Sequence, residues 1–267
     1  MAQSTSVAPT AQRSVGALLR QWREHRRLSQ LDLSLQADVS TRHLSFVETG
    51  RSAPSRDMVL HLADSLDLPL RERNQMLLAA GYAPVYSQAP LDSPRMRAVR
   101  GAVRQVLTGH DPYPALAVDR GWHLVEANDS VSVLLAGVSP DLLVPPVNVL
   151  RVSLHPDGLA PRIVNLGEWR AHLLARLRGQ ITLTADQDLA ALHDELAGYP
   201  CDQLEPVVDQ HSADVVVPLR IRAAGAELSF FGTVTTFGTP LDITVAELAI
   251  ESFFPADEAT AAALGTK

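Results

Sequence analysis

Residues 28–50 read Leu-Ser-Gln-Leu-Asp-Leu-Ser-Leu-Gln-Ala-Asp-Val-Ser-Thr-Arg-His-Leu-Ser-Phe-Val-Glu-Thr-Gly. Ser29 and Ser40 stand where each can cap a helix, because a serine hydroxyl accepts a hydrogen bond from a free N–H group of the first turn. Asp38 lies between the two helices, at a position that needs a left-handed backbone, which Asp tolerates better than most residues. Ser34 is small enough to let the two helices cross. The stretch therefore predicts a helix-turn-helix.

Further short helices flank this motif. The apolar residues Val15, Leu18, Leu19 and Trp22 recur at the spacing of one buried helix face. A fourth apolar stripe starts at Met58, after the turn at Pro54-Ser55, and a fifth helix is expected from Leu70 to about Ala80, ended by Gly81. We predict an all-α domain of five helices over residues 13–81, preceded by a disordered arm (1–12) and followed by a linker (82–94) that contains three prolines.

The motif resembles the λ-repressor-like (XRE-type) helix-turn-helix, which also tends to end in Glu-x-Gly, as Glu48-Thr49-Gly50 does here. In that family the outward residues at the start of the second helix enter the major groove of DNA. The resemblance implies a set of base readers, and the neighbouring polar residues are expected to contact phosphate through side chains and a helix N-terminus. The residues expected to read DNA bases are Ser40, Thr41, Arg42 and Phe46. His43 is expected to contact a base or a phosphate. The residues expected to contact the DNA backbone are Ser29, Gln30, Arg51, Ser52 and Arg56.

Two alternatives remain open for this surface. Arg42 would pair bidentately with guanine, but an outward Arg on a helix bundle is also compatible with simple solvation. Phe46 would contact a thymine methyl group, or would instead pack on the second domain or on a partner subunit. Glu48 is expected to be a local structural acceptor, because phosphates would repel its carboxylate.

From residue 95 the pattern changes to mixed helices and strands. Helices are expected over 95–108, from Asn128 as a cap to Ala136, and over 161–179 and 185–198. Strands are expected at Ala115–Asp119, Trp122–Ala127, Asp214–Arg222, Ala226–Phe237 and Leu241–Phe253. This order predicts an α+β domain with an antiparallel five-stranded sheet over residues 95–267.

Several short stretches along the whole chain resemble the MmyB-like branch of the same regulators. They include the stretch from Ser40 through Glu48-Thr-Gly-Arg-Ser-Ala-Pro-Ser55, Leu70-Arg-Glu-Arg-Asn74, Ala79-Ala-Gly-Tyr-Ala-Pro84, Pro112-Tyr-Pro-Ala115, Asp119-Arg-Gly-Trp122 with Asn128, His155-Pro-Asp-Gly158, Trp169-Arg170, Asp242-Ile-Thr-Val-Ala-Glu247 and Phe253-Phe-Pro-Ala-Asp257. The resemblance covers about residues 14 to 260. It implies a PAS-like ligand-binding domain, a small apolar ligand such as a fatty-acyl-like one, and a homodimer, although no coiled-coil heptad is visible.

A ligand site needs an apolar concave wall and a few polar anchors. The apolar candidates are Trp122, Leu134, Leu150, Trp169, Leu173, Leu177, Phe230 and Phe237. Arg162, Asn165 and Arg170 are the candidate anchors, and an anionic ligand would favour the two Arg. The alternative for each residue is an ordinary place in the core or on the surface.

Composition narrows the class of protein. The net charge is −7, but residues 1–80 hold ten Arg and eight acidic residues, whereas residues 81–267 hold thirteen basic and twenty-two acidic residues. A single cysteine, Cys201, excludes an internal disulfide and suits the cytoplasm. No signal peptide or membrane-spanning run is visible, and no resident cofactor or metal is expected. The cluster His193-Asp194-Glu195 cannot converge on one ion, because adjacent helical residues face different directions.

The interpretation that combines these features is a cytoplasmic one-component regulator. A homodimer would bind a palindromic double-stranded operator, and a small molecule in the second domain would change that binding. One alternative is a constitutive DNA-binding regulator whose second domain only dimerises. Another is an enzyme with a vestigial regulatory domain, which the absence of any catalytic motif disfavours.

Overall fold

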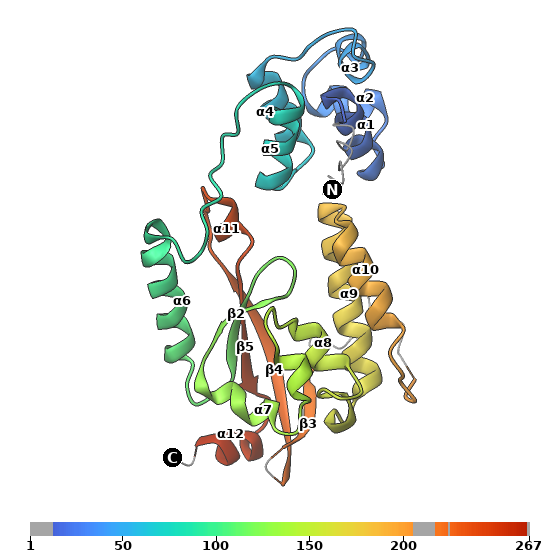
Figure 1. Ribbon diagram of the computed structural model, residues 1–267. Coiled ribbons are helices and arrows are strands. Elements are labelled where there is room, and N and C mark those ends of the chain that lie inside the picture. Colours follow the sequence, from blue (N-terminus) through green and yellow to red (C-terminus); the bar gives the residue numbers. More distant parts are fainter. Residues whose placement is uncertain (1–12, 205–216, 224, 266–267) are drawn as a thin grey trace, which may run out of the picture. The chain divides into compact units, whose positions relative to one another are not determined.

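The computed structural model describes residues 13–204, 217–223 and 225–265, and the predicted arm over 1–12 lies outside the described residues. The chain forms two compact units (Figure 1). The first comprises Met1–Ser87 with Leu183–Ala185, and the second comprises Gln88–Thr182 with Asp186–Lys267.

The first unit contains the five predicted helices. They are α1 (Val15–His25), α2 (Gln30–Gln36), α3 (Thr41–Glu48), α4 (Arg56–Ser65) and α5 (Leu70–Ala79). Their apolar stripes meet in one core that includes Leu19, Trp22, Leu33, Leu44, Val47, Leu62 and Leu77. The five amphipathic helices predicted from the spacing of the apolar residues are therefore confirmed.

Serine caps fix where four of these helices begin. The hydroxyl of Ser29 accepts from the backbone N–H of Asp32, whose carboxylate accepts from the backbone N–H of Ser29, so the two form a capping box. Ser40 Oγ accepts from His43 N at 3.2 Å, and Ser14 and Ser55 cap α1 and α4 in the same way. Asp38 has a φ of 49°, the left-handed conformation expected for the turn of the motif.

Two small residues allow the helices of the motif to approach each other. Ser34 is buried, and its hydroxyl lies 2.9 Å from that of Thr41, so α2 and α3 touch through hydroxyl groups. Gly16 of α1 lies against the end of α3: a Cβ there would stand 2.3 Å from the carbonyl oxygen of Val47 and 2.7 Å from that of Glu48. No larger residue fits at Gly16 unless the two helices separate.

The second unit is built on a five-stranded antiparallel sheet of order β2-β1-β5-β4-β3. The strands are β1 (Ala115–Val118), β2 (Leu124–Ala127), β3 (Leu219–Ala223), β4 (Ala226–Thr236) and β5 (Ala249–Pro255). The α+β prediction is confirmed, with two strands before the long helices and three after them. The expected strand at Asp214–Arg222 is described only from residue 217 on, and its residues 214–216 lie outside the described part of the chain.

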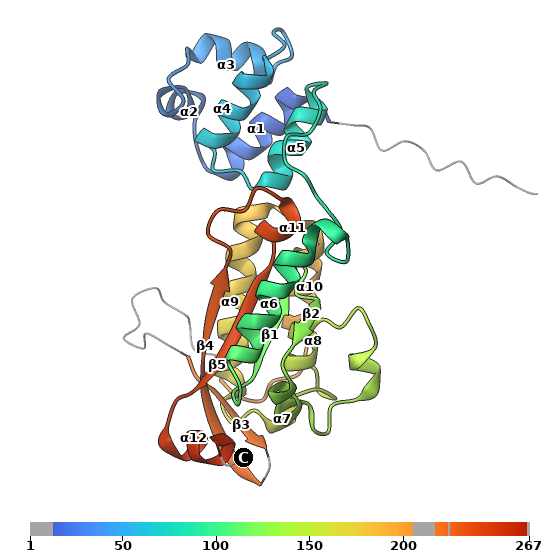
Figure 2. The same cartoon turned by 90° about the vertical axis from the view of Figure 1, so that its left-hand side faces the viewer.

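Helices cover both faces of this sheet (Figures 1 and 2). Helix α6 (Arg97–Gly109) packs on one face, where Val103 and Leu107 contact Ala115 and Ala117 of β1. The alternate residue Val118 points to the opposite face and joins the larger core. That core is completed by α7 (Ser132–Leu135), α8 (Val149–Leu154), α9 (Leu166–Thr184) and α10 (Gln187–Ala197).

Four details differ from the sequence prediction. The helix expected from residue 161 begins at Leu166, because Ile163 forms an antiparallel bridge with Ile221 of β3. The strand expected over Leu241–Phe253 is broken by helix α11 (Ile243–Ala246), whose cap Asp242 accepts from the backbone N–H of Thr244. Helices α8 and α12 (Glu258–Gly265) were not anticipated.

The fourth difference concerns Asn128, whose side chain makes no capping hydrogen bond. Its oxygen accepts from Ala115 N at 2.9 Å, and its amide nitrogen donates to the carbonyl of Tyr113 at 2.8 Å. The residue therefore ties the start of β1 to the chain that follows β2. A capping pattern in the sequence cannot distinguish this non-local use of the amide from a local one.

Candidate functional site

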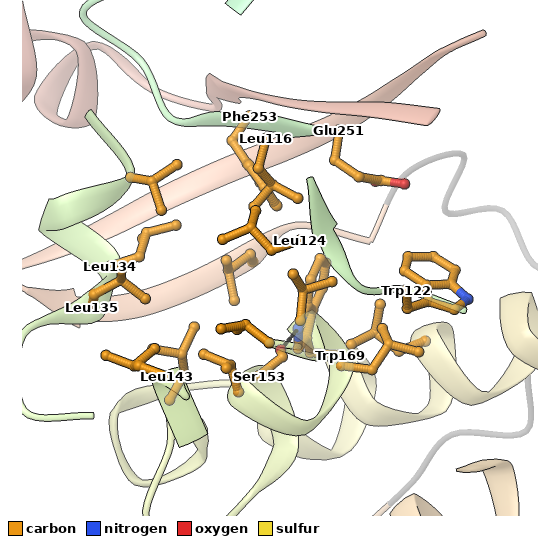
Figure 3. A pocket seen from close by; sticks show the side chains of 18 of the residues that line it. Leu116, Trp122, Leu124, Leu134, Leu135, Leu143, Ser153, Trp169, Glu251 and Phe253 are labelled. Carbon is orange, nitrogen blue, oxygen red and sulfur yellow. Dashed lines mark hydrogen bonds between the residues drawn. The ribbon is translucent and has the colours of Figure 1, made fainter. Parts of the chain in front are cut away.

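A cavity of about 320 Å³ lies within the second unit, between the sheet and helices α7, α8 and α9 (Figure 3). Its wall is formed by Leu116, Trp122, Leu124, Val131, Leu134, Leu135, Leu143, Val147, Val149, Leu150, Val152, Ser153, Leu159, Trp169, Leu173, Arg176, Leu219, Glu251 and Phe253. Most of these side chains are aliphatic or aromatic, so the cavity favours apolar groups.

The two cavity tryptophans satisfy their own polar atoms. Trp169 Nε1 donates to Ser153 Oγ at 3.0 Å, and Trp122 Nε1 donates to Gln180 Oε1 at 2.8 Å. Trp122 also adopts a φ of 63°, which is unusual for a residue with a Cβ. Because both indole N–H groups already have acceptors, the rings offer the cavity their apolar faces.

One ion pair interrupts the apolar wall. Arg176 of α9 binds Glu251 of β5 through two hydrogen bonds, Nη2 to Oε1 at 2.7 Å and Nη1 to Oε2 at 3.1 Å. The guanidinium carbon also lies 4.9 Å from the centre of the Trp122 ring. Figure 3 shows Glu251 and Trp122 at one end of the cavity and Leu134, Leu135 and Leu143 at the other.

A histidine lies behind this wall. His172 stacks on Trp169, with 5.6 Å between the ring centres. Burial, together with the nearby positive charge of Arg176, lowers the pKa of His172. At neutral pH the imidazole is therefore uncharged.

Five of the eleven residues predicted to bind a ligand line this cavity: Trp122, Leu134, Leu150, Trp169 and Leu173. Leu177 and Phe230 lie deeper in the same core, both fully buried, and Phe237 packs in the small core beneath α6. Spacing along a helix or strand marks all of them as inward-facing, but it does not show which of them meet a void.

The three expected anchors are not among the residues that line the cavity. The guanidinium groups of Arg162 and Arg170 donate to the carbonyl oxygens of Leu134 and Ala197. Asn165 donates to the carbonyl of Pro218 at 2.9 Å and accepts from Arg220 N at 3.1 Å, which fixes the start of α9 against β3. Sequence reasoning also missed Arg176 and Glu251, which are far apart in the chain and follow no motif.

In the first unit, α3 presents Arg42 to solvent and holds Phe46 half-buried. The guanidinium carbons of Arg42 and Arg51 lie 5.3 and 5.9 Å from the Phe46 ring centre. Phe46 therefore supports both cations on one face of the unit. The remaining predicted residues on this part of the surface are Ser52, which is half-buried, His43, which is half-buried, and Arg56, which is exposed.

The other predicted DNA contacts have partners within the unit. Ser29 and Ser40 act as helix caps, and Thr41 shares a hydrogen bond with Ser34. Gln30 donates to Glu48 Oε2 at 2.8 Å. A hydroxyl that caps a helix still lies at the helix N-terminus, where the free N–H groups favour an anion.

Glu48 connects the helices of the motif. Its carboxylate accepts from Arg23 Nε at 2.6 Å and from Arg23 Nη2 at 3.0 Å, in addition to the bond from Gln30. The hydrogen bond to Glu48 raises the pKa of Arg23. The predicted role of Glu48 as a structural acceptor is confirmed, because its carboxylate holds the end of α3 to α1 and to the first turn of α2.

Comparison with known families assigns both units. Residues 99–266 match the model of the MmyB-like transcription regulator ligand binding domain, and residues 14–76 match a helix-turn-helix domain model. No curated protein matches the chain. Among the described residues, no group of three His, Cys, Asp or Glu side chains is placed to hold a metal ion, and no helix is long and apolar enough to cross a membrane.

Proposed function

Because the chain belongs to the MmyB-like transcription regulators, we propose that it is a one-component sensor, a DNA-binding transcription regulator that responds to a small apolar ligand. The observation that carries this proposal is the apolar cavity of about 320 Å³ in the same chain as a helix-turn-helix. A ligand that binds there with different affinity in two states of the protein would change its affinity for DNA.

The size of the cavity bounds the ligand. The volume of about 320 Å³ is at the lower end of the range of about 300–1,000 Å³ that is usual for small-molecule sites. A medium-chain, fatty-acyl-like ligand suits a site of this size.

The surface around Phe46 supports different roles for Arg42 and Arg51 in DNA binding. Arg42 stands on the outward side of α3, where a guanidinium reaches the edge of guanine in the major groove. Arg51 follows the helix and stands where a phosphate contact is expected. Arg42 would therefore select sequence, and Arg51 would contribute affinity on every sequence.

The functional form would be a homodimer in the cytoplasm. Each helix-turn-helix would bind half of a palindromic operator, with half-sites about one helical turn of DNA apart or a multiple of it. The alternative is a constitutive regulator whose second unit only dimerises. The cavity favours the sensor, because a domain used only for dimerisation needs no room for a ligand.

The first test is selection of double-stranded DNA from a random pool by the full chain, followed by affinity measurements on the selected sequence. Arg42→Ala should reduce the discrimination between selected and unselected DNA, whereas Arg51→Ala should weaken both and flatten the dependence of affinity on salt. Equal losses on all sequences for Arg42→Ala would contradict its assignment as a base reader.

The second test measures affinity for the selected DNA with and without nine-carbon ligands of different head groups. A change in DNA affinity on ligand binding supports the sensor. Binding of a ligand with no change in DNA affinity would favour the constitutive alternative.

A further inference from the structure

The position of the Arg176–Glu251 pair constrains the polar end of a ligand. These two are the only charged side chains among the described residues that line the cavity. The carboxylate occupies both terminal nitrogens of the guanidinium, and the Trp122 ring lies near its carbon. Glu251 takes only two of the five N–H groups of the guanidinium, but its carboxylate already balances the positive charge that would attract a ligand carboxylate.

A ligand carboxylate would also meet a charge of its own sign. The side chain of Glu251 is only 9% exposed, so its charge is weakly screened by water. To bind Arg176, a ligand anion would have to displace Glu251 or share the one cation with it. In both cases one negative charge would stay uncompensated against an apolar wall, which is strongly unfavourable.

An uncharged head group avoids this cost. A hydroxyl or amide can hydrogen-bond to the outer side of the pair without separating the two charges. No second cation compensates a negative head among the described residues that line the cavity, because Arg162 and Arg170 are not part of its wall and their guanidinium groups donate to the backbone carbonyls of Leu134 and Ala197. The net charge of the two side chains at this end of the cavity is therefore zero before a ligand binds.

We propose that the cavity selects uncharged amphiphiles, such as medium-chain alcohols or primary amides, and that Glu251 is the residue that excludes carboxylates. The inference rests on the proposed function, since it concerns the ligand of the same cavity. It assigns a specificity-determining role to a pair that the sequence did not indicate.

The test is calorimetric titration of the full chain at pH 7.5 with 1-nonanol, nonanamide and nonanoate, which have the same chain length. We expect 1-nonanol or nonanamide to bind at least tenfold more tightly than nonanoate. If nonanoate binds as tightly as either neutral ligand, the inference is overturned while the proposed ligand cavity stands. If none of the three binds, the proposed function is overturned, and the inference with it.

Variants of the ion pair test whether the charge of Glu251, and not the shape of the cavity, excludes carboxylates. Glu251→Gln frees the guanidinium, so the ratio of the nonanoate Kd to the 1-nonanol Kd should fall at least tenfold. Adding Arg176→Met should abolish that fall, because the liberated cation is gone. Glu227→Gln is the matched control, because Glu227 pairs with Arg220 on an exposed part of the sheet and should leave the ratio unchanged. An unchanged ratio in Glu251→Gln, with the fold intact by circular dichroism, would also overturn the inference.

Discussion

Replacing Glu48 by Leu should unfold the helix-turn-helix unit much more easily, and replacing Arg23 by Met in the same chain should restore most of the loss. The side chains of Arg23 and Glu48 are only 9% and 2% exposed, so their attraction is little screened. Leu in place of Glu48 leaves the guanidinium of Arg23 with the carbonyl of Leu28, at 2.8 Å, and with the largely exposed carboxylate of Glu24, at 3.8 Å.

Removing one partner of such a buried pair typically costs about 3–5 kcal/mol, because the other charge stays buried without compensation. Replacing both partners by apolar side chains of similar volume is often neutral or stabilising. We therefore expect Glu48→Leu and Arg23→Met each to lower the unfolding free energy of the unit by about 3–5 kcal/mol. The double variant should lie within about 1 kcal/mol of the parent, so the cycle should show a large coupling energy.

Amide hydrogen exchange on the full chain measures this locally. A loss of about 3–5 kcal/mol corresponds to exchange about 150- to 5,000-fold faster for amides of α1 and α3 that exchange through unfolding of the unit. Amides of the sheet provide the internal standard. Glu227→Leu is the control, because its pair with Arg220 is 43% and 45% exposed, and surface pairs contribute about 0–1 kcal/mol. Single variants that cost under about 1 kcal/mol, or costs that simply add in the double variant, would refute the reasoning.

Three further predictions concern packing and charge. Gly16→Ala should destabilise the first unit by about 1–3 kcal/mol, since overpacking against the carbonyls of Val47 and Glu48 exceeds the gain in helix propensity of about 1 kcal/mol. Gly101→Ala on α6, where the added methyl meets open space, should instead stabilise the second unit, and equal effects on urea unfolding at both positions would contradict the argument. His172 has a folded-state pKa below the ordinary value of 6.5 for a histidine, so its contribution to stability is present above pH 6.5 and is lost as pH falls below it. His172→Gln should make thermal stability less dependent on pH between 6.5 and 5, and an unchanged slope would count against burial of the neutral imidazole. Leu173→Ala should cost about 2–4 kcal/mol and enlarge the cavity, and a longer neutral amphiphile such as 1-undecanol should then raise the melting temperature more than it does in the parent chain.

The helix-turn-helix was predictable because its signals are local. A cap, a left-handed turn residue and a small crossing residue lie within a few positions of one another, at Ser29, Asp38 and Ser34. Each acts through backbone geometry that the nearby chain imposes. Gly16 belongs to the same packing, but its contact with α3 crosses about thirty residues and the sequence carried no sign of it.

The cavity was predictable only in part. Helical spacing marked Trp169, Leu173 and Leu177 alike as inward-facing, and the structure places the first two at the void and the third in solid core. A periodic pattern reports the direction of a side chain but not whether an atom faces it from the other side.

The sequence of this chain was sufficient for the two kinds of unit, the five helices of the first and the order of the five strands along the second, because these follow from local backbone preferences and hydrophobic period. The residues that form the polar end of the cavity were decided only by the tertiary structure. Arg176 and Glu251 are 75 residues apart, and they meet because β5 lies in the middle of the sheet beneath α9. Long-range ion pairs leave no periodic or local signature, so the charge balance that would select the ligand emerges only when the chain has folded.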